Sequence, residues 1–177
     1  MDNLAYVNSR PPRCLAPFKI APVEMPDAEW DGHGEELNPV FQVSCTCGSR
    51  AHSISGFSWR PSEEAAERVF LSPIGLTCTS CSKQSVLIDT DAHGYDAELG
   101  HGSTTVRGEG DPMKFRCEKC SNESMEVLVR FEYPADVFGD DFEDFKGGRA
   151  DLFTWVSVVG RCQGCKGLWA VADYECA

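Results

Sequence analysis

The chain has 177 residues, of which 42% are hydrophobic, and a formal net charge of −12. This length suits one domain or two small ones with a buried core. No stretch approaches the roughly 20 apolar residues of a membrane-spanning helix, and residues 1–13 lack the apolar segment of a secretory signal. We therefore expect a folded cytoplasmic protein with no membrane segment.

Residues 1–40 hold six of the ten prolines. Proline fixes φ and removes a backbone donor, so this segment is expected to be an extended arm and not a helix. Its apolar side chains, among them Phe18, Ile20 and Trp30, are expected to pin it to the body of the protein.

From Val40 onward, a unit of short apolar strand, cysteine pair, polar turn and second strand occurs four times. Two cysteines two or three positions apart on a tight turn can point both sulfurs at one centre, and a second pair completes the tetrahedron that Zn²⁺ accepts. In a reducing cytosol such thiols favour metal over disulfides. The pairs are Cys45/Cys47, Cys78/Cys81, Cys117/Cys120 and Cys162/Cys165.

Joining neighbouring pairs along the chain predicts two Cys₄ sites. Both sets of ligands are complete, without the open position of a catalytic zinc, so we expect two structural Zn²⁺ ions. Ligand softness alone leaves iron as an alternative. Site one consists of Cys45, Cys47, Cys78 and Cys81, and site two consists of Cys117, Cys120, Cys162 and Cys165.

The first pair is Cys-x-Cys, whereas the other three are Cys-x-x-Cys. Gly48 follows Cys47 at the place where a knuckle turn takes a positive φ, which makes Cys47 the firmer ligand. His52 is the alternative to Cys45, because Zn²⁺ also accepts a Cys₃His set.

Between the pairs, residues 61–71 are expected to form one short helix, with Ser62 as its N-cap. Residues 125–133 alternate apolar and polar side chains, which indicates a strand, and residues 152–159 are expected to pair with it antiparallel.

Residues 92–112 contain five glycines and are interpreted as a linker or long loop. His93 and His101 lie here, close to Asp91 and Asp96. Histidine with carboxylates can form a metal or acid–base site, so a metal-dependent enzyme is one alternative function.

Residues 136–145 alternate three phenylalanines with acids. One interpretation is a solvated loop whose phenylalanines fold back onto the sheet. The other is a docking surface, in which acids steer a basic partner and phenylalanines supply affinity.

The cysteine pairs on antiparallel strands resemble the zinc-ribbon and rubredoxin-like knuckle proteins over residues 41–177. The pattern predicts a mainly β fold with one short helix, in two zinc-ribbon-like halves that are each closed by a Cys₄ site. The expected segments are a proline-rich arm (1–40), a first unit with the helix and the glycine-rich loop (41–112), and a second unit with the acidic loop (113–177).

The charge of −12 repels nucleic-acid phosphates and favours a basic partner. Our leading hypothesis is a non-enzymatic two-zinc protein that binds a basic protein through its acidic surface. An inhibitor or immunity-type protein for a basic toxin or nuclease, or an adaptor, would suit this charge. A nucleic-acid-associated zinc-ribbon protein is a further alternative.

Overall fold

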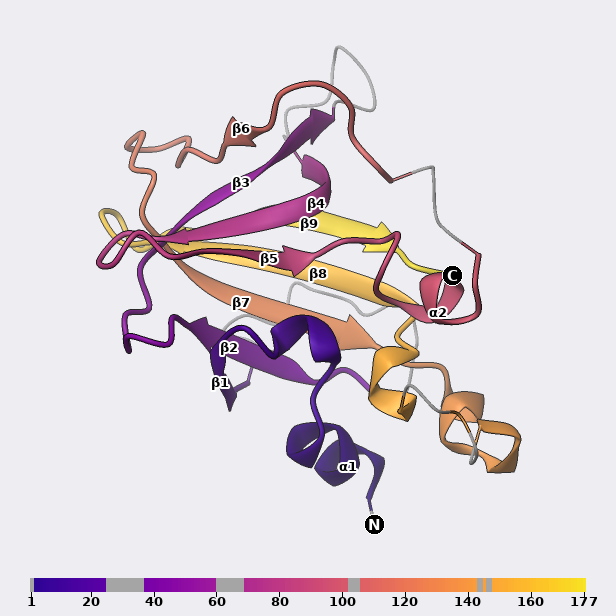
Figure 1. Ribbon diagram of the computed structural model, residues 1–177. Coiled ribbons are helices and arrows are strands. Elements are labelled where there is room, and N and C mark those ends of the chain that lie inside the picture. The colour runs from indigo at the N-terminus through magenta and orange to yellow at the C-terminus, as the bar shows by residue number, and fades with distance from the viewer. Residues whose placement is uncertain (1, 25–36, 60–68, 102–105, 143–144, 146–147) are drawn as a thin grey trace.

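The computed structural model describes all residues except 1, 25–36, 60–68, 102–105, 143–144 and 146–147 (Figure 1). The described part is mainly β, as predicted, with nine strands and every strand-to-strand pairing antiparallel. The strands are β1 (Lys19–Pro22), β2 (Val40–Ser44), β3 (His52–Trp59), β4 (Val69–Cys78), β5 (Gln84–Ile88), β6 (Met113–Lys114), β7 (Met125–Glu132), β8 (Trp155–Cys162) and β9 (Leu168–Glu175).

Short helices lie between these strands and at the N-terminal end. The α-helices are α1 (Asn3–Ser9) and α2 (Tyr95–Glu98), and the 3₁₀ helices are η1 (Arg13–Leu15), η2 (Ala135–Phe138), η3 (Asp140–Phe142) and η4 (Arg149–Asp151). No helix in the described ranges is long and apolar enough to cross a membrane.

The sheet consists of two branches that meet at one end. One branch runs β1-β2-β7-β8-β9, and the other contains β3, β4 and β5, with β6 paired to β3. Between β3 and β7, the backbone pairing that joins the branches covers one residue pair, His52 and Met125. The strands converge at this end, here called the apex, and diverge toward α2 and the C-terminal end (Figure 1). We call the diverging end the open end.

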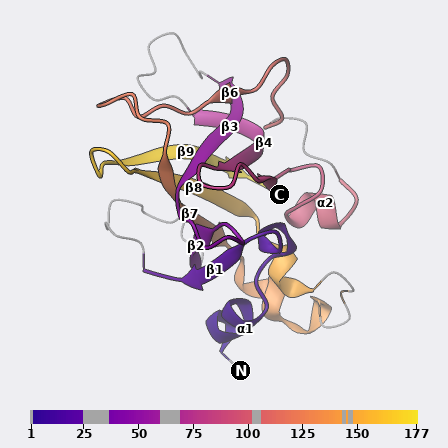
Figure 2. The ribbon, with the colours of Figure 1, turned by 60° about the vertical axis from the view of Figure 1, so that its left-hand side comes forward.

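The main core fills the space between the branches. Strand β4 alternates strictly between buried and partly exposed residues, so one of its faces points inward. Val127, Val129 and Phe131 of β7 are 0–1% exposed, and Ile54 and Ile74 of the other branch are fully buried in the same cluster. Figure 2 shows β3 and β4 above β7, β2 and β1.

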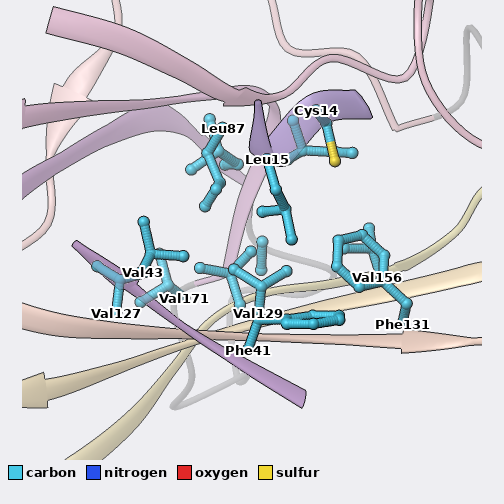
Figure 3. Packing of buried hydrophobic residues seen from close by; sticks show 14 of the residues in the cluster. Cys14, Leu15, Phe41, Val43, Leu87, Val127, Val129, Phe131, Val156 and Val171 are labelled. Carbon is cyan, nitrogen blue, oxygen red and sulfur yellow. The ribbon is translucent and has the colours of Figure 1, made fainter. Parts of the chain in front are cut away.

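The N-terminal segment contributes directly to this core. Leu15 of η1 is 1% exposed and points between Leu87 and the side chains of Phe41 and Val129 (Figure 3). Cys14, beside it, is also buried. The segment therefore packs as part of the domain.

The prediction that residues 1–40 contain no helix was wrong for α1. Asp2 caps this helix, its side chain accepting the N–H of Leu4, and the first proline comes only at position 11. Phe18 and Ile20 pack against the core, as expected, and Trp30 lies outside the described residues.

The helix expected at 61–71 falls mostly on residues 61–68, which lie outside the described part. Its last three positions were predicted wrongly, because Val69–Leu71 begin β4 and pair with Phe57–Trp59 of β3. Cross-strand pairing and burial of Phe70 outweigh the local helix signal here.

The expected antiparallel pair in the second half is confirmed, since β7 and β8 pair along the whole of Met125–Glu132. The two predicted halves share one sheet. Strand β2 of the first half pairs with β7 of the second, and β6 of the second pairs with β3 of the first.

Replacing Tyr133 by Phe tests how strongly the open end is held. The Tyr133 hydroxyl is buried and donates to the Ala150 carbonyl at 2.7 Å. Removing it leaves a buried carbonyl without this donor, which should lower the free energy of unfolding by about 1–2 kcal/mol in urea denaturation. Tyr6→Phe, which keeps the ring contact with Phe138, is the control. Equal losses in the two variants would contradict the prediction.

Candidate metal centres

The four cysteine turns, residues 45–52, 78–84, 117–124 and 162–168, all lie at the apex. The sheet register shows why: His52 lies opposite both Cys78 and Met125, and Met125 lies opposite Cys162. These four residues form one row across four strands, and each is 0–1% exposed. One cysteine of each predicted site is thus fixed in the same row.

The cysteine sulfurs form two groups of four, partitioned as the sequence predicted, with the sulfurs of each group within 4.8 Å of one another. In site one, the Sγ atoms of Cys45 and Cys81 are 3.5 Å apart, and those of Cys47 and Cys78 are 3.7 Å apart. The corresponding distances in site two are 3.5 Å for Cys117–Cys165 and 3.4 Å for Cys120–Cys162. A tetrahedron with Zn–S bonds of about 2.3 Å has edges of about 3.8 Å, so each group can surround a single ion.

The backbone of all four turns follows one pattern. The N–H of the first cysteine donates to the residue that closes the turn, at 2.8–2.9 Å, and the residue after the second cysteine donates back to the first cysteine's carbonyl. That second donor always has a positive φ: Gly48 (96°), Ser82 (61°), Ser121 (58°) and Lys166 (64°). The turn expected at Gly48 is confirmed, and the other three positions were missed, although each follows the second cysteine of its pair just as Gly48 does.

This pattern also directs backbone donors at the sulfurs. Burial raises the pKa of the Cys78 thiol, but the N–H groups of Cys81 and Ser80 lower it to a net value of about 6. Cys117 behaves alike: burial raises its pKa, and the N–H groups of Cys120 and Lys119 bring it to about 6. Each group therefore holds a thiolate at neutral pH, the form that metals bind.

Neighbouring sulfurs share this negative charge unevenly. The N–H of Lys83 lowers the pKa of Cys81, but its contacts with Cys45 and Cys78 raise it to about 12. A proton therefore stays on Cys81 when Cys78 is a thiolate. A bound divalent cation would supply the positive charge that lets all four sulfurs ionise.

Each site joins a segment that connects the two branches of the sheet to a hairpin of one branch. In site one, Cys45 and Cys47 follow β2, whereas Cys78 and Cys81 lie on the β4–β5 hairpin. In site two, Cys117 and Cys120 lie between β6, which pairs with β3, and β7. Cys162 and Cys165 lie on the β8–β9 hairpin. An ion in either site would tie the branches together beside the His52–Met125 pair.

His52 does not join the sulfur group, and Cys45 does. The His52 ring is buried, with Nδ1 3.1 Å from the Arg50 carbonyl. Because a carbonyl only accepts, Nδ1 carries the ring proton in this contact. Burial lowers the pKa of His52, so the ring is held neutral at the junction of the branches. Sequence reasoning named His52 only as an alternative ligand, because only the register places it between the two sites.

The structure does not bring His93 and His101 into a metal site. His93 is half-buried and its Nδ1 accepts the N–H of Asp89 at 3.0 Å. His101 is exposed, and its backbone N–H donates to the Asp96 carbonyl. Within the described ranges, neither histidine belongs to a group of three or more side chains that could hold an ion.

The other two cysteines, Cys14 and Cys176, are buried and reduced. Burial raises the pKa of both thiols well above neutrality, so they remain protonated. They behave as core residues.

Comparisons of the chain with protein-family models, with curated proteins and with solved structures found no match.

Gly48→Ala tests the positive-φ requirement of the first turn. A Cβ at this position would meet no atom within 4 Å, so the expected loss comes from the backbone alone. We expect the metal-loaded protein to lose about 1–2 kcal/mol of unfolding free energy in denaturant titrations. Ser82→Gly, at the equivalent position of the second turn, should cause no such loss. A neutral Gly48→Ala variant would contradict this account of the turn.

A second pair of variants separates the two candidate ligands of site one. Cys45→Ser should reduce bound metal from two ions per chain to about one, because three thiolates leave a tetrahedral site incomplete. His52→Gln should keep both ions. Inductively coupled plasma mass spectrometry of the purified variants measures this, and the opposite result would make His52 the ligand.

Proposed function

We propose that this protein is a non-enzymatic scaffold, held together by two structural metal ions, that binds a basic protein through its acidic open end. The observation that carries the scaffold part of this proposal is that each four-sulfur group joins a segment connecting the two branches to a hairpin of one branch. Four thiolates complete the coordination of a tetrahedral ion and leave no position for substrate, which favours a structural role.

Zn²⁺ is the ion that we propose for both sites, with iron as the alternative. Thiolate sulfur is a soft donor that suits both metals, and the sulfur spacing of 3.4–3.7 Å fits a single tetrahedral ion. Ions at these sites would compensate for the short backbone pairing between β3 and β7.

Charge is unevenly distributed between the two ends. The four cysteine turns carry four Lys or Arg and two acids. The cations offset part of the charge of −2 that each filled Cys₄ site would carry. By contrast, the described residues of 89–98 and 133–154, which contact each other at the open end, contain eight acids and one arginine.

Two arginines at the open end already form ion pairs with acids of this surface. Arg107 bridges Asp89 and Asp91, and Arg13 bridges Glu98 and Asp151. Asp136 and Asp140 remain exposed on η2 and η3. Such a surface would accelerate the encounter with a positively charged protein and would repel nucleic-acid phosphates.

The phenylalanines of residues 136–145 fold back onto the protein. Phe138 packs against Tyr6 and Tyr133, and Phe142 packs against Tyr95. Phe145 is also partly buried against the core. The acids of this loop, rather than its aromatic rings, therefore offer the contact surface. An inhibitor or immunity-type protein for a basic toxin or nuclease fits this surface, and an adaptor is the wider class.

Removal of metal should unfold the apex. Structural zinc contributes on the order of 10 kcal/mol to small domains, so a strong chelator should abolish the cooperative thermal transition and much of the β signal in circular dichroism. Readdition of Zn²⁺ should restore both. Cys176→Ser, which changes a thiol outside the two groups, should respond as wild type does. A chelated protein with an unchanged transition would contradict the structural role.

Neutralising acids at the open end should weaken binding to a basic probe. Glu175, the last residue of β9, is a further exposed acid at this end. The combined variant Asp136→Asn, Asp140→Asn and Glu175→Gln should bind a lysine-rich peptide several-fold more weakly at 50 mM salt, and 200 mM salt should reduce wild-type binding similarly. Glu118→Gln, an exposed acid of the third cysteine turn, is the matched control. Fluorescence anisotropy of the labelled peptide measures the effect of the substitutions and the effect of salt. Tighter binding of duplex DNA than of the peptide would support the nucleic-acid alternative instead.

A further inference from the structure

Four sulfur–sulfur contacts of 3.4–3.7 Å, two in each site, join one cysteine turn to the turn that faces it. They are Cys45–Cys81, Cys47–Cys78, Cys117–Cys165 and Cys120–Cys162. Each contact also joins a buried cysteine to one that reaches the surface. Cys45, Cys78, Cys117 and Cys162 are 0–4% exposed, whereas Cys47, Cys81 and Cys120 are exposed and Cys165 is partly so.

The turn itself produces this asymmetry. In each turn the first cysteine lies at or near a strand end, with its side chain directed into the apex. The second cysteine lies on the outer part of the turn, before the residue with positive φ. Two such turns that face each other bring the outer sulfur of one against the inner sulfur of the other.

We propose that these four contacts are sites of oxidation by peroxides, at which the outer cysteine is attacked and the inner cysteine of the facing turn resolves it into a disulfide. The inference rests on the proposed function in taking the sulfurs as metal ligands. It adds a reactive role for them and specifies which sulfurs become bonded.

The chemistry balances within each contact. In the metal-loaded protein, where a bound cation would let all four sulfurs ionise, the outer thiolate attacks one peroxide oxygen. The O–O bond breaks and hydroxide leaves, so that sulfenic acid forms. The inner thiolate then attacks the sulfenic sulfur, an S–S bond forms and a second hydroxide leaves. Two thiolates have lost two electrons and one peroxide has gained them. Each Cys₄ site thus consumes two peroxides, forms two disulfides and releases its ion.

The connectivity decides what oxidation does to the fold. A disulfide within one turn, such as Cys78–Cys81, would bridge residues of a single hairpin and constrain nothing else. A disulfide between Cys47 and Cys78 instead joins the segment after β2 to the end of β4, and so it links the two branches. The oxidised, metal-free protein should keep its fold, whereas the reduced, metal-free protein should lose it.

The experiment oxidises the full-length, metal-loaded and reduced protein with hydrogen peroxide. Metal content is measured first, and released metal is followed with a chromogenic chelator. Disulfides are then mapped by mass spectrometry of peptides digested without reductant. We expect about four peroxides per chain to release both ions, with the four disulfides joining facing turns. Circular dichroism should show retained β structure after oxidation.

Cys78→Ser removes one resolving thiol and should leave Cys47 as a sulfenic acid that a cyclic dione labels. Cys176→Ser is the control and should show the wild-type disulfide map. If Cys78→Ser does not fold, the wild-type map decides alone. Disulfides within single turns, or sulfinic acid without disulfides, would overturn the inference while leaving the proposed function intact. If the purified protein contains no metal, the proposed structural role of the ions is contradicted. The disulfide map then still tests the proposed oxidation of the sulfur contacts.

Discussion

The structure depends on how the two branches of the sheet are held together at the apex. Backbone pairing between β3 and β7 extends over one residue pair, His52 and Met125, whereas β7 and β8 pair over eight residues. Backbone pairing over a single residue pair therefore contributes little to fixing the angle between the two branches. The two four-sulfur groups lie beside this junction, and each joins a segment that connects the two branches to a hairpin of one branch. Metal coordination at these groups is the interaction that can keep the branches in place over the core.

The same turn geometry governs stability and reactivity. In each turn the residue after the second cysteine has a positive φ and the first sulfur is buried. In the Cys78 and Cys117 turns, backbone N–H groups of the turn also point at that first sulfur. The second sulfur of each turn lies near the solvent. Metal affinity and exposure to oxidants therefore arise from one local structure. Because the close sulfur contacts cross between turns, either an ion or a pair of disulfides can link the branches.

In our proposal, the sites at the apex stabilise the fold and the acids at the open end bind the partner. Four Lys or Arg belong to the cysteine turns, and the acids are concentrated on the segments that follow β5 and β7. The strands separate the two ends, so a partner can approach the open end without contacting the metal sites (Figure 1). Phe138 and Phe142 stabilise the open end from inside by packing on Tyr133 and Tyr95.

The sequence by itself determined the eight cysteines of the two groups, the β character of the chain and the pairing of residues 125–133 with 152–159. These follow from local rules: ligand spacing on a turn and alternation along a strand. It could not reveal that β2 and β6 each pair with a strand of the other predicted half. Nor could it show that Val69–Leu71 belong to a strand, or that His52 lies at the junction of the branches. Strand order and register depend on contacts between residues that are distant in the sequence. Nor could the sequence decide whether the phenylalanines of 136–145 face solvent. Only the tertiary structure, by offering Tyr6, Tyr95 and Tyr133 as partners, turned them inward.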